Sequence, residues 1–286
     1  MKNIVRNVMV GGLGVLGVIS TVVVGWFMLN ESSLVFPGQS RTDLPIAPGA
    51  AAEFPWDSLR VGGADGATTF LIESRLLTDV SGRWAIFFHG NDMLVSDSGG
   101  RYALLRAAGF NVLSVEFRGY GASKALGRAE EQGTYLDAMA GWTYLTETRG
   151  VRPDSIVVYG FSIGSGPATF LAAQEDLAGI ITEGAFTSAP DIAVLRYPWL
   201  PVRWLMKTQF SNIERADSVS EPWLLFHGLD DQIVPFSHAG ALAKAAPNAR
   251  VVPLEAGHSN GVTKHRETLL NALREFAIEV FGEAGR

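Results

Sequence analysis

The 286-residue sequence contains no cysteine and only five histidines. Without cysteine the chain forms no disulfide bond, offers no thiolate to a metal and carries no acylated lipoprotein cysteine. The histidines show no spacing typical of a metal site, so we expect neither a metal nor a cofactor. A net charge of −6 gives no basic face for nucleic acid. No glycine-rich phosphate loop follows the first predicted strand, which argues against a nucleotide cofactor.

Long apolar stretches are equally scarce, and the chain has a single hydrophobic span of membrane length. Val8 to Leu29 is 22 residues without a charge. As a helix at 1.5 Å per residue it would be about 33 Å long, enough to cross a bilayer core of roughly 30 Å. Lys2 and Arg6 precede it, so the positive-inside tendency leaves the N-terminus cytoplasmic. We therefore predict a signal anchor over residues 1–30, a single-pass protein and a catalytic domain on the exported (periplasmic or extracellular) side.

A cleaved signal peptide is the rival interpretation of this segment. Against it, the apolar run exceeds the usual core of such peptides and no small-x-small cleavage pattern follows Leu29. Residues 31–55 contain four prolines and are predicted to be a tether or a segment laid over the domain. The remaining residues, 56–286, are sufficient for one large α/β domain.

The most informative motif is a G-x-S-x-G pattern centred on Ser162. An apolar, strand-like segment over residues 155–159 precedes it, and a small-residue segment with helical potential follows. This context predicts a nucleophile elbow, a sharp strand-to-helix turn that exposes the serine hydroxyl. Gly160 and Gly164 would avoid collisions with neighbouring backbone. The helix N-terminus behind Ser162 would supply free N–H groups where an oxyanion forms.

A serine hydroxyl needs a base to take its proton and an acid to orient that base. Residues 222–235 read as a buried strand that runs into a polar loop with Asp230 and Asp231. Residues 250–260 read as another strand whose loop carries His258. Loops at the C-terminal ends of neighbouring parallel strands converge, so Ser162, His258 and one aspartate of the pair are expected to meet. Glu183, at the end of another apolar segment, is an alternative acid.

Turn-rich motifs follow several predicted strands. They are Phe88-His89-Gly90-Asn91, Glu116-Phe117-Arg118-Gly119-Tyr120-Gly121-Ala122-Ser123, His227-Gly-x-x-Asp231-x-x-Val234-Pro235 and Gly257-His258. With the elbow, these motifs make the chain resemble the α/β-hydrolase-fold serine hydrolases, especially the membrane-anchored α/β-hydrolase-domain proteins with a short cap. The resemblance implies that Asp231 rather than Asp230 is the acid. It also implies an oxyanion hole formed by the N–H groups of Asn91 and Ile163, each worth on the order of 3 kcal/mol in the transition state.

The other histidines have less specific interpretations. His89 and His227 are expected to brace the two loops that carry them. His238 and His265 lie on predicted helices with polar neighbours, and we expect both to face solvent.

The order of predicted elements indicates an α/β fold with a mainly parallel sheet covered by helices on both faces. After a hairpin over residues 59–73, we predict strands at 84–89, 111–116, 155–159, 179–183, 223–227 and 250–254, and helices at 100–108, 130–148 and 263–281.

The one irregular insertion, about residues 185–221, is rich in apolar and aromatic side chains. It has three compatible interpretations: a small satellite core, a short cap whose wall receives an acyl chain, or a surface that touches a membrane. For the cap, the candidate pocket residues are Tyr197, Trp199, Trp204 and Met206.

Together these patterns predict a membrane-anchored serine hydrolase that cleaves carboxylic esters or thioesters of small-molecule or lipid-like acyl groups. Ser162 would attack the acyl carbon, His258 would transfer the proton, and Asp231 would fix the imidazole tautomer. The same machinery serves a peptidase or amidase. A hypothesis of another class is a non-catalytic, membrane-tethered binding protein on a hydrolase scaffold, which is distinguished by whether Ser162 reacts with an organophosphonate. The sequence indicates no particular protein partner.

Overall fold

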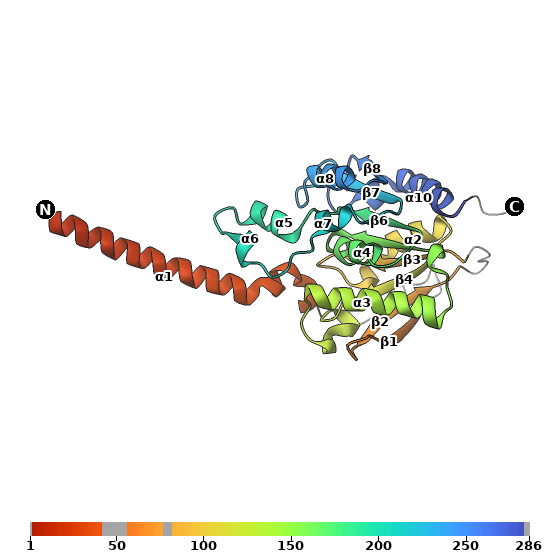
Figure 1. Ribbon diagram of the computed structural model, residues 1–286, viewed down its shortest axis with the longest axis horizontal. Helices are drawn as coiled ribbons and strands as arrows, with labels where there is room; N and C mark the ends of the chain where they lie inside the picture. Colours follow the sequence, from red (N-terminus) through yellow and green to blue (C-terminus); the bar gives the residue numbers. More distant parts are fainter. Residues whose placement is uncertain (1, 42–55, 77–81, 283–286) are drawn as a thin grey trace.

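The computed structural model describes residues 2–41, 56–76 and 82–282, with the backbone alone for 2–17. At its centre is an eight-stranded sheet in the order β1-β2-β4-β3-β5-β6-β7-β8 (Figure 1). The strands are β1 (Asp57–Gly62), β2 (Thr68–Ser74), β3 (Trp84–Phe88), β4 (Asn111–Glu116), β5 (Ile156–Phe161), β6 (Gly179–Glu183), β7 (Trp223–Gly228) and β8 (Ala249–Leu254). β1 and β2 pair antiparallel at one edge, and every pairing from β4 to β8 is parallel. The predicted mainly parallel sheet is confirmed.

The central strands are buried on both faces, which explains their continuous apolar runs. In β3, Trp84, Ile86 and Phe88 belong to one core, while Ala85 and Phe87 belong to the other. This alternation follows from the two-residue period of a strand. Such a strand end is held rigidly from both sides and can position the residues that follow it.

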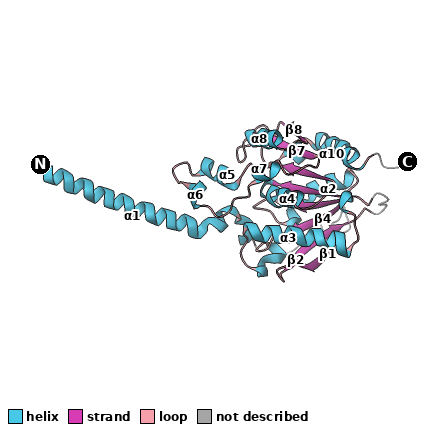
Figure 2. Ribbon diagram, in the orientation of Figure 1, coloured by secondary structure: helices cyan, strands magenta, loops and turns pink. Residues whose placement is uncertain are grey.

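Helices cover both faces of the sheet (Figure 2). On one face, α2 (Gly99–Ala107) and α10 (Arg266–Phe281) contribute Tyr102, Leu105, Leu273 and Phe276 to the core. The opposite core receives side chains from α3 (Glu131–Thr143), α4 (Ser165–Ala172), α7 (Asn212–Ala216) and α8 (Ser237–Ala245). The short helical turns are Pro37–Ser40, Val95–Ser98, Gly121–Leu126, Pro153–Ser155 and Ser162–Gly164.

Two predicted helices differ from the observed ones. The helix predicted at 130–148 is α-helical only to Thr143 and continues as a π-helical turn, Tyr144–Thr148. The helix predicted at 263–281 is divided into α9 (Gly261–Lys264) and α10. The division occurs because His265 leaves the helical region, with φ −126° and ψ 35°, and its Nε2 approaches the carbonyl oxygen of Glu255 at 3.1 Å.

The chain enters the domain through a long helix, α1 (Lys2–Val35), which projects away from the sheet (Figure 1). Its C-terminal part packs on the protein, where Phe27 is 3% exposed. Directly after α1, Phe36 is fully buried and its ring meets that of Phe210 edge-on at 6.0 Å between centroids. Of the predicted tether, residues 31–41 are therefore described and packed against the domain, while 42–55 lie outside the described residues.

No helix in the described part of the chain is both long and apolar enough to cross a membrane. The side chains of residues 1–17, which make up much of the predicted anchor over residues 1–30, lie outside the described residues.

The insertion between β6 and β7 contains α5 (Ala189–Arg196), α6 (Val202–Leu205) and α7. We call residues 185–221 the cap. Its first two helices lie beside the end of α1 (Figure 1), and Leu200, Val202 and Met206 form a small core with Phe27. The ring of Tyr197 also meets that of Phe27 edge-on at 5.7 Å between centroids. The cap and α1 thus form one wall over the C-terminal ends of the strands.

Candidate active site

Ser162 follows β5 directly and has φ +52°, a left-handed conformation that is costly for a residue with a Cβ. The turn is so tight that its two glycines have no room for side chains. A Cβ on Gly160 would lie 2.4 Å from the carbonyl oxygen of Gly164, and a Cβ on Gly164 would lie 2.2 Å from that of Phe88. The local sequence therefore forces the chain into a strained strand-to-helix turn with Ser162 at its apex.

Three side chains from three loops form one continuous hydrogen-bonded chain. The Oγ of Ser162 lies 2.8 Å from Nε2 of His258, and Nδ1 of His258 lies 2.7 Å from Oδ2 of Asp231. Asp231 follows β7 and His258 follows β8, so both loops stand at the same end of the sheet as Ser162. Gly184, after β6, leaves space for the imidazole, because a Cβ there would lie 2.9 Å from Cε1 of His258.

The carboxylate of Asp231 is fixed by its own loop as well as by His258. Its Oδ1 accepts the N–H groups of Ile233 at 2.9 Å and Val234 at 2.8 Å. Burial by itself raises the pKa of Asp231, but the hydrogen bond and charge of His258, with the two N–H groups, bring that pKa below the usual 3.8. Asp231 is therefore ionised at neutral pH. Asp230 is exposed, and within the described residues its side chain has no hydrogen bond or ion pair with His258.

This arrangement decides the tautomer of His258. An ionised carboxylate only accepts hydrogen bonds, so Nδ1 of His258 must donate to Asp231. The lone pair of Nε2 then faces the Ser162 hydroxyl and can accept its proton. A serine, a neutral imidazole and a carboxylate in this order have the geometry that activates a nucleophile.

The two N–H groups expected to hold an oxyanion belong to Asn91 and Ile163, and both residues line the same cavity as Ser162. Ile163 stands at the start of a helical turn, where N–H groups lack partners within the helix. Two hydrogen bonds hold the backbone of Asn91 in place. Its carbonyl oxygen accepts one from the Tyr120 hydroxyl at 2.6 Å and one from the N–H of Gly38 at 3.0 Å. The segment after α1 thus supports one side of the site.

Buried histidines brace the loops around the site. His89 is fully buried; its Nδ1 contacts the carbonyl oxygen of Gly90 at 2.9 Å, and its Nε2 accepts the N–H of Phe117 at 3.3 Å. His227 contacts the carbonyl oxygen of Val234 through Nε2 at 2.8 Å, beside Asp231. Burial lowers the pKa of His227 below its usual 6.5, so the ring stays neutral at pH 7.

One expectation about a side chain near the site is wrong, and one alternative is not favoured by the geometry. His238 was expected to face solvent but is half-buried, because its Nδ1 lies 2.9 Å from the Thr187 hydroxyl at the start of the cap. Glu183 is not brought to His258. Its carboxylate is held instead by two bonds from Arg101, at 2.7 and 2.8 Å, and by the Tyr159 hydroxyl at 2.7 Å.

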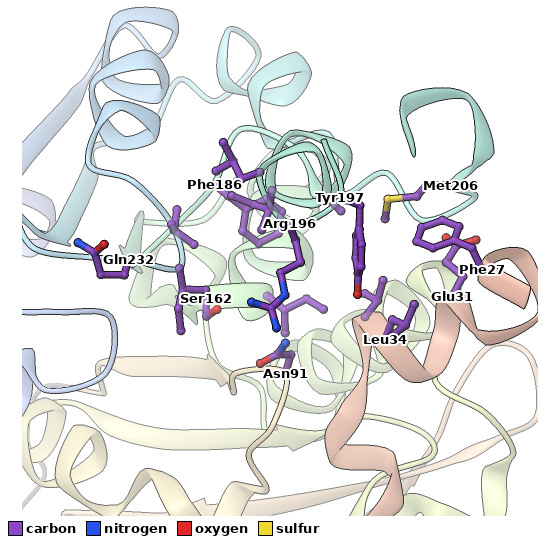
Figure 3. Close-up of a pocket in the computed structure, with 18 residues that line it drawn as sticks. Phe27, Glu31, Leu34, Asn91, Ser162, Phe186, Arg196, Tyr197, Met206 and Gln232 are labelled. Atoms are coloured by element: carbon purple, nitrogen blue, oxygen red, sulfur yellow. The ribbon is translucent and has the colours of Figure 1, made fainter. Parts of the chain in front are cut away.

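A cavity of about 600 Å³ opens beside Ser162 (Figure 3). Its lining residues come from α1, the cap and the loops around the site: Phe27, Glu31, Leu34, Val35, Asn91, Ser162, Ile163, Phe186, Ala189, Ile192, Ala193, Leu195, Arg196, Tyr197, Met206, Gln232, Ile233 and Val234. Of the four candidate pocket residues, Tyr197 and Met206 are in this lining. Trp199 and Trp204 are not, and they are 68% and 90% exposed.

The tryptophans point outward because Val202 and Met206 occupy the inner side of this segment against α1. Sequence reasoning missed the contribution of α1 to the lining, together with Arg196 and Gln232. One signal was available: Glu31 and Leu34-Val35-Phe36 continue past the predicted anchor with a mixture of charge and apolar residues that suits a packed helix end.

Within the described residues, no group of three or more histidine, aspartate or glutamate side chains could hold a metal.

The sequence is similar to a known protein family and to several known proteins. Residues 96–284 match the prolyl oligopeptidase family. An uncharacterised protein of Mycobacterium tuberculosis is 36% identical over 177 residues, which are 61% of this chain and 62% of that protein. The human alpha/beta hydrolase domain-containing protein 17B is 32% identical over 179 residues, 61% of this chain and 60% of that protein. The matched region thus spans about three fifths of each relative's own length.

Among solved structures, an esterase of Pyrococcus furiosus superimposes with a TM-score of 0.67 over 85% of this chain and 97% of that one, at 18% identity. Because the identity is low, the superposition establishes the fold alone. The α/β-hydrolase fold expected from the sequence is confirmed.

Proposed function

This chain belongs to the prolyl oligopeptidase family and is an α/β hydrolase, and we propose that it is a serine hydrolase of carboxylic esters or thioesters. One observation carries the proposal: the hydrogen-bonded chain from Ser162 through His258 to Asp231, with the hydroxyl at the edge of a cavity. The strain at Ser162 supports it, because left-handed conformations at non-glycine residues cluster at functional sites.

In the proposed reaction, Oγ of Ser162 attacks the acyl carbon while Nε2 of His258 takes the hydroxyl proton. The carbonyl oxygen becomes an oxyanion that accepts the N–H groups of Asn91 and Ile163. When the tetrahedral intermediate collapses, His258 returns the proton to the departing alcohol or thiol and an acyl-serine remains. Water then attacks the acyl carbon, with His258 again as base, and Ser162 is restored with its proton as the acid is released.

The apolar lining of the cavity favours substrates with an apolar acyl group. Phe27, Leu34, Phe186, Ile192 and Met206 contribute apolar side chains to its lining. Its size lies within the range of small-molecule sites, which bind mainly by apolar contact with a few placed polar groups. We therefore propose small-molecule or lipid-like acyl substrates.

Turnover of p-nitrophenyl esters with acyl chains of two to sixteen carbons tests this proposal. The 286-residue chain, purified in detergent, is compared with Ser162→Ala and, as a control, with Ser237→Ala at an exposed serine on α8. Loss of at least about 10³-fold in kcat for Ser162→Ala alone is expected. Equal turnover by Ser162→Ala and the unchanged protein would contradict the proposal.

Peptidase or amidase activity is the second candidate, and the name of the family favours it. The same assay with p-nitroanilides of matched acyl groups separates the two activities. A ratio of kcat/KM for ester over anilide no larger than the ratio of their uncatalysed rates would favour the amidase.

The membrane anchor over residues 1–30 is a further proposal that rests on the sequence. It would hold the domain on the exported side of a membrane, close to lipid-derived substrates. Alkaline extraction of membranes from cells that express the 286-residue chain tests it. Retention in the pellet is expected, and release into the supernatant would contradict it.

A further inference from the structure

One cationic side chain enters the cavity next to the proposed nucleophile. Arg196 is the last residue of α5 and lines the cavity together with Ser162 and Asn91. Figure 3 shows its side chain extending from the cap into the cavity, in the direction of Ser162 and Asn91. Within the described part of the chain, its guanidinium has no hydrogen-bond or ion-pair partner.

The other two arginines of the cap, Arg203 and Arg215, both have partners within the protein. Arg203 on α6 pairs with Asp191 at 2.5 Å. Arg215 on α7 lies over the ring of Tyr135 and donates a hydrogen bond to the hydroxyl of the same tyrosine at 2.8 Å. A basic residue in the last turn of a helix is favourable with the helix dipole, but that effect requires no particular direction of the side chain. The helix dipole therefore explains why a basic residue ends α5. It does not explain why the side chain of Arg196 extends into the cavity.

The second charged group in the lining, Glu31, is already occupied. It is 5% exposed, and its Oε1 accepts the N–H groups of Lys207 at 2.9 Å and Thr208 at 2.7 Å. In Figure 3 it stands with Phe27 and Leu34, on the α1 side of the cavity. The cavity thus has a fixed negative charge at the α1 wall and a free positive charge toward Ser162. An anionic group would be favoured only near the serine.

We propose that Arg196 binds a free carboxylate of the substrate, so that the enzyme prefers esters whose acyl part carries a second carboxylate a few carbons from the scissile carbonyl. This inference rests on the proposed function. A guanidinium matches a planar carboxylate through two parallel N–H bonds. No other Lys, Arg or His is in the described lining, and Glu31 opposes additional negative charge, so a monoanion fits better than a phosphate dianion.

The preference is measured with two esters of equal length, mono-p-nitrophenyl glutarate and p-nitrophenyl valerate, which differ by a carboxylate. The readout is the ratio of kcat/KM for the charged ester over the neutral one in the 286-residue chain. We expect Arg196→Met to lower this ratio about fivefold to tenfold, because the contact is partly open to water. Arg196→Lys should keep part of the preference. The control Arg203→Met, which removes a cap arginine outside the lining, should leave the ratio unchanged.

Charge reversal provides a second test that a general loss of packing cannot imitate. Arg196→Glu should favour the p-nitrophenyl ester of 4-(trimethylammonio)butanoate over the valerate ester. Raising the salt concentration from 0.05 to 0.5 M should shrink the preference of the unchanged protein for the glutarate ester.

A ratio that is the same in the unchanged protein and in Arg196→Met would overturn the inference. If valerate ester turnover still depended on Ser162, the proposed function would survive that result. If the folded protein cleaved neither ester, the proposed function itself would fail, and this inference with it.

Discussion

Asp231 and His258 meet at 2.7 Å between Oδ2 and Nδ1, although they belong to loops after two different strands. The other oxygen of Asp231 is already held by the N–H groups of Ile233 and Val234. The carboxylate is therefore oriented by its own loop before it contacts the imidazole. This relationship fixes which nitrogen of His258 faces Ser162, and the proposed chemistry depends on it.

Asp231→Asn should lower kcat on a neutral ester by about 10⁴-fold, because an amide no longer selects the tautomer that accepts the serine proton. Asp230→Asn is the matched control, since Asp230 is an exposed neighbour in the same loop. Steady-state kinetics with circular dichroism of each variant provide the measurement. A similar loss in both variants would mean that the charge of the loop matters and the contact with His258 does not.

Gly164→Ala should destabilise the elbow, because the added methyl would lie 2.2 Å from the carbonyl oxygen of Phe88. Relief requires backbone movement in β3 or α4, for which we expect a loss of at least about 2 kcal/mol in the free energy of unfolding. In Gly240→Ala, on α8, the methyl would meet nothing within 4 Å. That control should be neutral or stabilising by up to about 1 kcal/mol. Urea unfolding followed by fluorescence measures both, and equal stabilities would show that the turn has more room than described.

Phe27→Ala should move the preferred acyl chain toward longer esters, because the ring both lines the cavity and packs in the small core under the cap, so its removal enlarges the cavity. Phe27 is 3% exposed, whereas the adjacent Trp26 is 54% exposed, which makes Trp26→Ala the control. The p-nitrophenyl ester panel provides the measurement. An unchanged optimum in Phe27→Ala would show that α1 does not limit the acyl site.

Burial lowers the pKa of His238 below its usual 6.5. The folded protein therefore keeps His238 neutral at pH values where the unfolded chain binds a proton. The free energy of unfolding should fall as the pH drops below 6.5, and continue to fall until the lowered pKa is passed. His238→Gln should show a shallower fall between pH 7 and pH 5 in urea unfolding. Parallel curves for the two proteins would contradict this role of His238.

The fold was predictable because its signals are local. Continuous apolar runs such as Trp84–Phe88 identify strands buried on both faces, and the turn residues after them identify the ends at which loops converge. The order of Ser162, Asp231 and His258 along the chain led to the expectation that they meet, and the structure brings them into one hydrogen-bonded chain. Their catalytic roles are proposals.

The wall of the cavity was not predictable because it depends on contacts between distant segments. Phe27 meets Tyr197 across 170 positions of sequence, and no periodicity in either segment indicates the pairing. The outward direction of Trp204 follows from Val202 and Met206 packing on α1, which again requires knowledge of where α1 lies. The direction of Arg196 into the cavity has the same origin, since the course of the cap sets it.

Labelling of the 286-residue chain with a fluorophosphonate, with the adduct located by peptide mass spectrometry, tests whether Ser162 is an activated nucleophile. We predict a single adduct on Ser162 that is absent from Ser162→Ala and greatly slowed in His258→Gln. A folded protein that takes no label, or takes it at another residue, would contradict the serine hydrolase proposal. That result would favour a binding protein built on a hydrolase scaffold.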